Sequence, residues 1–464
     1  MIFLLCTAFP ERIKHEWLPC ILHPDFHVVE IPEWIFHRYG FCHSSLSHNQ
    51  NKSTMKVFRL LLAVLLAVSQ SVPAMAAEFI KIAVTGPFSG GSAPMGTSMR
   101  DGVRLAFAQI NRNGGITVGG RKMAVVLVER DDEGKNDRGA LVAQEISSMD
   151  DISAVIGTVN TGVAVMGDKY YVAKGLVKII TPAAGSMSLT QWNKAGVKDL
   201  PIFRFAAHDG IQAGMVVEQA LNLRLTKVAI LHDATNYGVS GRDDLVAQIE
   251  KTGNKLHVVA IEKFAIGDRD MTAQLKKARL AGAQAILIWG IGPELAAVAS
   301  GKEKLGYKVP IIGGWTLSMS NFIDAAGAAG NGALMPQTFI EDESIRRARP
   351  FIQAYHKAYG VSRIPSPVSA AQGYDAALVL AEAIHEAGST NPSKIKEALE
   401  NLKGTVRGAI TDWKKPWSKW DPADSDSHEA FRRGNTVIGK VQNGRVVLAD
   451  PADLHVLEDA GAKR

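Results

Sequence analysis

Cysteine is nearly absent from this sequence of 464 residues, and its three copies, Cys6, Cys20 and Cys42, all lie in the first tenth of the chain. From residue 77 onward there is no cysteine at all. This long part therefore has no disulfide and no thiolate ligand for a metal, and a processed N-terminus there cannot carry a lipid on cysteine. A chain without cysteine is also safe in an oxidising export compartment.

A large excess of charge of one sign is missing as well, and so are long apolar runs. From residue 77 onward the chain carries 46 lysine and arginine residues against 41 aspartate and glutamate residues, spread along its length. That balance predicts a soluble protein with no nucleic-acid partner, because no basic stripe is present. No segment in this part reaches the roughly 20 apolar residues needed to span a bilayer.

Enzyme signatures are absent too. The sequence contains no GxGxxG after an expected strand, no GxxxxGK[ST], no HExxH and no GxSxG. The seven histidines from residue 208 onward show no metal-ligand spacing, and His232, beside Asp233, is interpreted as structural rather than catalytic. We therefore expect no catalytic residue, no metal and no cofactor, and we interpret the chain as a protein other than an enzyme.

Residues 55–76 have the organisation of a secretory signal peptide. Met55 is followed by two basic residues, a short apolar run over 60–68 and small residues at 74–76. The run is too short to span a membrane. The pattern predicts export to the periplasm and a mature chain that begins at Ala77.

The 54 residues before Met55 are unusual for a chain with such a signal. They hold all three cysteines and six of the thirteen histidines, and they show no sustained apolar period. We interpret residues 1–54 as the product of an upstream start site that is not used, or as a disordered leader; a real cytosolic extension is the alternative. None of these alternatives contributes to the fold.

The rest of the chain alternates short β-rich runs with helical ones. Several runs are continuous stretches of valine and isoleucine, which is typical of parallel strands covered on both faces. Strands are expected at 79–88, 123–132, 152–157, 177–182, 227–233, 257–264, 285–290 and 309–314. Helices are expected over 103–113 and near 137–149, 163–174, 239–252, 270–281, 294–305, 350–359, 370–387 and 393–401.

This alternation predicts an α/β fold class. The elements form two series that divide near 203–208, and each series is expected to fold as a lobe with a doubly wound parallel sheet flanked by helices. In such sheets ligands bind beyond the carboxyl ends of the strands. We therefore expect a ligand site in a cleft between two lobes.

Seven collinear stretches together resemble one known family. They are AVTGPFSGG (83–91), AFAQINRNGGI (106–116), ERDDEGKND (129–137), AVIGTVNTG (154–162), IITPAAGSMSL (179–189), ILHDATNYGVSG (230–241) and AAQGYDAALVLAEAI (370–384). In this combination the chain resembles the periplasmic solute-binding proteins of branched-chain amino-acid ABC importers, the Leu/Ile/Val-binding family. The resemblance covers nearly all of the chain after residue 77.

The resemblance implies a two-lobed type I periplasmic binding fold, which is crossed three times by the chain and closes on its ligand. It implies an N-terminal lobe made of residues 77–205 and 338–433, and a C-terminal lobe made of residues 206–337 and 434–464. The partners would be a small carboxylate or amino-acid ligand and the membrane permease of an ABC transporter. We expect a monomer.

In the family a serine or threonine at a helix start binds the ligand carboxylate, and Thr161 stands at that position. A hydroxyl group combined with free amides at a helix N-terminus is a suitable anion site. The alternative is that Thr161 only caps its helix. In the next loop Ala183 matches a residue that offers its carbonyl, and Gly185 falls where the family has a hydroxyl, a departure that Ser186 could compensate.

The second lobe contributes Tyr237, which matches a tyrosine that covers the ligand in the family. Met95, Ile291 and Tyr374 are further candidates for the apolar side of the site. For Tyr237 the alternative is ordinary turn packing, and for the other three it is the core.

Trp315 is the departure with the largest consequence. It stands where amino-acid binders of the family place the acidic residue that holds the ligand ammonium. A buried charge that loses its partner costs about 3–5 kcal/mol, and a cation–π contact recovers only about 2. We therefore expect an aromatic or hydrophobic carboxylate in first place and a neutral branched-chain amino acid in second. Asp209 or Glu294 could replace the missing acid, and Trp315 could instead pack between the lobes.

Two questions stay open at this level. The segment 411–430, with Trp413, Trp417 and Trp420, is expected to pack on its own lobe, although it could brace the cleft. A ligand-sensing regulator with the same fold is the alternative to an importer subunit, and an exported α/β enzyme is a more distant one.

Overall fold

The structure is a computed structural model that describes residues 79–458. The predicted leader (1–54) and signal peptide (55–76) lie outside the described residues, as do the ends 77–78 and 459–464 of the predicted lobes. Within residues 79–458, no helix combines the length and the apolar character that a membrane span requires.

The first lobe is built on a six-stranded sheet. All its strands run parallel except β2, which forms an antiparallel hairpin with β3 at one edge. In spatial order the strands are β2 (Ile116–Val118), β3 (Arg121–Asp131), β1 (Phe79–Gly86), β4 (Ile152–Ile156), β5 (Lys178–Ile180) and β6 (Ile202–Arg204). The three strands from β4 to β6 are buried along their whole length, as expected for a sheet with helices on both faces.

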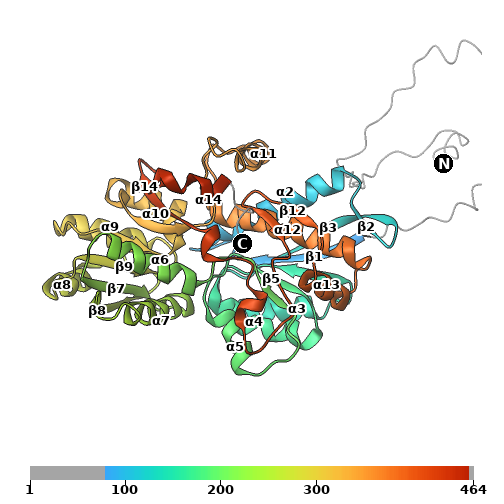
Figure 1. Cartoon of the computed structure of the whole chain (residues 1–464), viewed down its shortest axis with the longest axis horizontal. Helices are drawn as coiled ribbons and strands as arrows, with labels where there is room; N and C mark the ends of the chain where they lie inside the picture. Colours follow the sequence, from blue (N-terminus) through green and yellow to red (C-terminus); the bar gives the residue numbers. More distant parts are fainter. Residues whose placement is uncertain (1–78, 459–464) are drawn as a thin grey trace, which may run out of the picture. The chain divides into compact units, whose positions relative to one another are not determined.

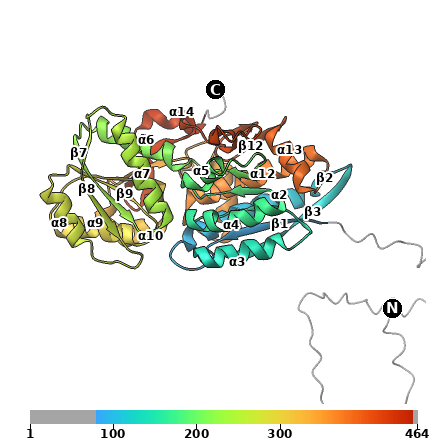
Figure 2. The ribbon, with the colours of Figure 1, turned by 90° about the horizontal axis from the view of Figure 1, so that it is seen from below.

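Helices pack on this sheet in pairs that are visible in Figures 1 and 2. Helix α3 lies along α4, and α12 lies along α2. Gly102 permits the second contact, because a Cβ atom there would stand 2.1 Å from the Ala370 carbonyl oxygen of α12. The helices of this lobe are α2 (Ala93–Arg112), α3 (Asn136–Ser147), α4 (Thr161–Lys174), α5 (Met187–Lys194), α11 (Arg349–Tyr359), α12 (Pro367–Ala387) and α13 (Pro392–Glu400).

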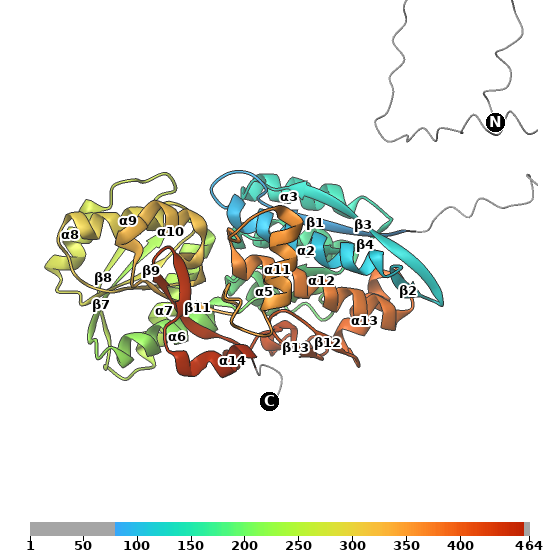
Figure 3. The same ribbon diagram turned by 90° about the horizontal axis from the view of Figure 1, so that it is seen from above.

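The second lobe contains a seven-stranded sheet. Its strand β14 pairs in an antiparallel manner with both of its neighbours, β11 and β15. In spatial order its strands are β15 (Arg445–Leu448), β14 (Val437–Gln442), β11 (Leu334–Gln337), β10 (Ile311–Gly313), β9 (Ala285–Trp289), β7 (Lys227–Asp233) and β8 (His257–Phe264). Figure 3 shows α8 and α9 beside this sheet. The helices of this lobe are α6 (Asp209–Asn222), α7 (Asn236–Glu250), α8 (Thr272–Leu280), α9 (Glu294–Lys304) and α10 (Ser320–Ala326).

The chain passes between the two sheets three times: after β6, after β11 and before β14. The predicted α/β fold with two parallel sheets is therefore confirmed. The antiparallel edges formed by β2, β14 and β15 were not expected from the sequence, and neither was β6, which has only three residues. The residue boundaries proposed for the lobes stay a prediction.

Candidate functional site

The loop after β4 leads directly into α4 and places Thr161 at the first helical residue. Gly157 opens this loop with φ of 126°, and a Cβ atom there would stand 2.0 Å from the Thr85 carbonyl oxygen. Only glycine fits such a position. Asn160, rather than Thr161, occupies the capping position, and its side chain makes no capping hydrogen bond. The hydroxyl group of Thr161 is therefore not used as a helix cap.

Thr161 is 1% exposed and faces the loop that follows β5. Its Oγ1 accepts a hydrogen bond of 3.2 Å from the amide of Gly185. A Cβ atom on residue 185 would lie 2.3 Å from this Oγ1 atom. The departure from the family at Gly185 thus has a physical reason, because any side chain there would collide with Thr161.

Ser186, the candidate to compensate for Gly185, contacts the second lobe in this structure. Its hydroxyl donates to Asp244 Oδ2 at 2.8 Å, and Asp244 belongs to α7 of the second lobe. Asn136 of the first lobe likewise donates to Asn236 of the second at 3.3 Å. These contacts bring the rim of one lobe against the rim of the other.

Arg204, at the end of β6, holds the same loop from behind. Its guanidinium donates 2.6 Å and 2.9 Å hydrogen bonds to the Gly185 carbonyl and to the Ser188 hydroxyl, and it forms a two-point ion pair with Glu429. Arg204 and Glu429 are both buried. A bidentate pair of this kind fixes geometry as well as charge, so Arg204 fixes the position of the Gly185 peptide.

Glu429 comes from the tryptophan-rich segment 411–430, which packs on the first lobe as expected. Trp417 Nε1 donates to the Arg204 carbonyl at 3.1 Å, and Trp420 Nε1 donates to the Val197 carbonyl at 2.7 Å. Trp413 Nε1 donates to Asp375 of α12 at 2.9 Å. The segment therefore covers the β6 edge of the first sheet.

Two aromatic side chains of the second lobe lie close together. Tyr237, in the first turn of α7, and Trp289, at the carboxyl end of β9, have ring centroids 6.1 Å apart. Both are buried, and neither Tyr237 Oη nor Trp289 Nε1 has a hydrogen-bond partner among residues 79–458. Gly314 lies beneath them, where a Cβ atom would stand 2.8 Å from Tyr237 Oη.

Asp209 completes the cluster at the start of α6. Its amide donates to the Ala184 carbonyl at 2.8 Å, next to Ala183, while its carboxylate is fully buried. Neither carboxylate oxygen has a partner at full hydrogen-bonding geometry in the described part of the chain, although the indole N–H of Trp289 lies close enough to favour the ionised form. Burial raises the pKa of Asp209 well above its usual range, and the Asp244 carboxylate adds to the rise, while Arg204 and the indole N–H of Trp289 oppose it.

The other acid considered from the sequence is placed differently. Glu294 begins α9, and its Oε1 accepts a 2.6 Å hydrogen bond from the Gly267 amide. It therefore serves the loop after β8. Of the two candidates, Asp209 is the acid that lies against the loop after β5 of the first lobe.

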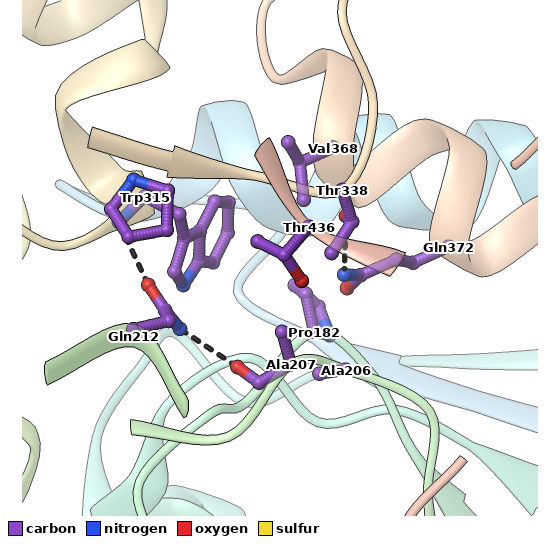
Figure 4. A pocket seen from close by; sticks show the side chains of 10 residues that line it. Pro182, Ala206, Ala207, Gln212, Trp315, Thr338, Val368, Gln372 and Thr436 are labelled. Carbon is purple, nitrogen blue, oxygen red and sulfur yellow. Dashed lines mark hydrogen bonds between the residues drawn. The ribbon is translucent and has the colours of Figure 1, made fainter. Parts of the chain in front are cut away.

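Trp315 is 5% exposed and begins the short 3₁₀ helix η2 (Trp315–Ser318). Its amide donates to Gln212 Oε1 at 3.0 Å, and Gln212 Nε2 donates to the Ala207 carbonyl at 2.7 Å (Figure 4). The side chain lines a small pocket beside Pro182. Trp315 is thus tied to the first crossover and to the loop that contains Ala183.

The remaining predicted residues lie in apolar surroundings. Met95 in α2 and Ile291 after β9 are buried members of the main hydrophobic core. Tyr374 packs on Phe351 with ring centroids 4.9 Å apart, and its Oη donates to Gln109 Oε1 at 2.7 Å. Its hydroxyl group is thus held by α2 of its own lobe.

The sequence analysis did not identify Trp289 or Asp244, and it considered Asp209 only as a replacement for the acid that is missing at position 315. Trp289 could have been found, since it ends a predicted strand and ligand sites gather at carboxyl ends of strands. Asp244 lies within α7, and no sequence signal marks it.

Two lobes built on largely parallel sheets, with unpaired polar groups buried between them, define the class of two-lobed ligand-binding proteins. The profile of a family described as "Periplasmic binding protein" matches residues 80–419. The chain belongs to this family, as the sequence resemblance predicted.

Individual relatives agree with this assignment. The leucine-, isoleucine-, valine-, threonine- and alanine-binding protein of Pseudomonas aeruginosa is 29% identical over 75% of this chain and 89% of its own length. A type 1 periplasmic binding protein from Bordetella pertussis has a TM-score of 0.69 and 26% identity, covering 80% of this chain and 99% of its own. A solute-binding protein from R. palustris in complex with benzoate has a TM-score of 0.64 and 19% identity over 80% of this chain and 96% of its own.

Proposed function

We propose that this chain is the periplasmic ligand-binding subunit of an ABC importer and that it holds a small carboxylate between its lobes. The ligand carboxylate would be bound by the Thr161 hydroxyl and the free amides of the first turn of α4. Hydrogen bonds to a charged group contribute about 1.5–3 kcal/mol each. A membrane permease would then recognise the closed form, and no chemical step is required.

The observation that carries the choice of ligand is the unpaired carboxylate of Asp209. A buried carboxylate that lacks a well-formed hydrogen bond costs free energy, and a ligand ammonium would provide both donors and the opposite charge. The preference for an acid without an ammonium group depended on Trp315 standing where the family has its acid. Asp209 is another acid, and it lies against the loop that contains Ala183 and Ala184. We therefore infer that a neutral α-amino acid is the preferred ligand.

An aromatic carboxylate is the second candidate. The apolar faces of Tyr237, Trp289 and Trp315 favour it, because flat aromatic surfaces pack well against a ring. In that case Asp209 would stay protonated, which burial already favours. The P. aeruginosa relative named for amino acids and the R. palustris structure with benzoate support one candidate each.

A thermal-shift screen of the purified protein against neutral amino acids and benzoate-like acids separates the candidates. A neutral amino acid should raise the melting temperature by several degrees at micromolar to millimolar levels, since a ligand stabilises the state that it binds. Stabilisation by benzoates alone would reject the role given to Asp209. A gene neighbourhood with permease and ATPase genes would favour import, and an adjacent histidine kinase gene would favour a ligand-sensing regulator.

A further inference from the structure

A small pocket lies where the chain crosses between the two sheets. Ala206 and Ala207 come from the first crossover, Thr338 from the second and Thr436 from the third. The cavity measures about 10 Å³, which is close to the least volume that holds one water molecule. A polar group of the size of a hydroxyl would therefore fill it.

Two polar atoms in the lining lack partners. Gln372 and Thr436 are each 2% exposed, and neither Gln372 Oε1 nor Thr436 Oγ1 has a hydrogen-bond partner among the described residues. One end of the Gln372 amide is held in place, because its Nε2 donates to Thr338 Oγ1 at 3.1 Å. Figure 4 shows the side chains of Gln372 and Thr436 pointing toward Pro182.

The pocket adjoins the proposed ligand site on two sides. Pro182 directly precedes Ala183 in the loop that faces Thr161. Gln212 lies three residues after Asp209, so both side chains share one face of α6. A ligand held by Thr161 and Asp209 would therefore lie against two chain segments, the loop after β5 and α6, that also line this pocket.

We propose that this pocket is the specificity subsite for the far end of the ligand, and that it selects a ligand ending in a hydroxyl group. The inference rests on the proposed function. A hydroxyl donates to Gln372 Oε1 and accepts from Thr436 Oγ1, so one group satisfies both unpaired atoms. A hydrocarbon end would leave both atoms buried and unpaired, which is unfavourable. A carboxylate end has no hydrogen to offer Gln372 Oε1, and no acidic side chain in the lining would pair with a cationic end.

Pairs of ligands that differ only by a methyl or hydroxyl end provide the test. Titration calorimetry would compare L-norvaline with L-homoserine, and 4-methylbenzoate with 4-hydroxybenzoate, on the purified full chain. We expect the hydroxyl member of the binding pair to bind about ten-fold or more tightly, since buried polar atoms then gain their partners. Equal or tighter binding of the methyl member would overturn the proposal.

Two substitutions of one residue separate recognition from packing. Thr436→Val keeps the shape of the side chain and removes Oγ1, so we expect the ten-fold preference to disappear while the methyl ligand binds as before. Thr436→Ser keeps the hydroxyl and should keep the preference. Equal weakening of both ligands by Thr436→Val would show a structural role and reject the subsite.

Two further outcomes also decide against the proposal. A crystal structure of the complex with an ordered water between Gln372 and Thr436, and the ligand elsewhere, would make the pocket a structural water site. If no amino acid or benzoate binds at all, the proposed function itself fails. That result differs from binding without a preference for the hydroxyl end, in which case only the subsite fails.

Discussion

Arg204 and Glu429 form a buried ion pair that joins the edge strand of the first sheet to the tryptophan-rich segment, across 225 residues of sequence. The same guanidinium donates to the Gly185 carbonyl. The segment that covers the sheet edge thus also holds the loop that faces Thr161. One arginine therefore links the packing of the tryptophan-rich segment to the position of the loop proposed to bind the ligand.

Removing the charge of Glu429 should be costly. Glu429→Gln leaves Arg204 buried without its counter-charge, which lowers the free energy of unfolding by about 3–5 kcal/mol. Urea unfolding measures this loss. The matched control is Glu218→Gln, which breaks the exposed Arg433–Glu218 pair and should cost at most about 1 kcal/mol. Similar losses in the two variants would show that the buried pair contributes no more to the free energy of unfolding than the exposed pair.

Gly185→Ala tests the contact between the loop and Thr161. The new Cβ atom would stand 2.3 Å from Thr161 Oγ1, so the loop must move and the anion site is distorted. We expect ligand affinity to fall about ten-fold or more, as when about 1.4 kcal/mol of binding free energy is lost. Calorimetry measures this change. Gly434→Ala, where no atom lies within 4 Å of the new Cβ, should leave binding unchanged. An unchanged affinity in Gly185→Ala would place the ligand away from this loop.

Asp209 should make amino-acid binding depend on pH. Burial raises the pKa of Asp209 and favours its protonated form, whereas a ligand ammonium would stabilise the ionised form. Binding then releases a proton, and affinity weakens as the pH is lowered through the range in which the free Asp209 carboxyl group titrates. The charged groups that face Asp209 are Asp244 and Arg204, and neutral Tyr237 and Trp289 lie beside it.

Calorimetry in buffers of different ionisation enthalpy counts the released protons. Asp209→Asn should abolish both the proton release and most of the amino-acid affinity. Asp243→Asn, at an exposed position on α7, is the control and should change neither. If wild-type affinity is flat across this pH range and Asp209→Asn binds amino acids normally, the ammonium partner is another group.

Glu400 should contribute to stability against acid. Although burial raises its pKa, hydrogen bonds from His428 and Lys396 lower the pKa of Glu400 to about 2, from an ordinary value of 4.5. A lowered pKa means that the stabilisation is present above about pH 4.5 and is lost as the pH falls toward 2.

Melting temperatures across this acid range test the contribution of Glu400. Glu400→Gln should be less stable at neutral pH and should lose part of the acid-dependent decrease in stability. Glu397→Gln, which removes an exposed partner of Lys394, should behave like the unmodified chain. Parallel curves for wild type and Glu400→Gln would contradict this prediction.

Strands that are long and apolar could be predicted from the local sequence pattern. The strand predicted over 257–264 matches β8, and the strand predicted over 227–233 matches β7. The three-residue strand β6 was not predicted. It is defined by its pairing with β5 and by the segment around Glu429 that covers it, and neither contact is local in sequence. A strand of three residues is too short to show a hydrophobic period that distinguishes it from a loop.

The site was predictable only in part. The loop that holds Thr161 follows from a strand, a glycine and a helix start, which are all local. The role of Trp315 could not be read in this way, because its amide pairs with Gln212, 103 residues away. Tyr374, a candidate for the apolar side of the site, has its hydroxyl on Gln109 of the neighbouring helix.

By itself the sequence determined the two-lobed α/β plan, the family and the position of the loop that holds Thr161, because apolar period, glycine at strand ends and helix starts are properties of neighbouring residues. Only the tertiary structure decided which buried polar groups find partners. Ser186 pairs with Asp244, while Asp209, Gln372 and Thr436 retain unpaired oxygen atoms within the described chain. Hydrogen bonding in a closed interior depends on atoms brought together from distant segments, and no local pattern specifies it.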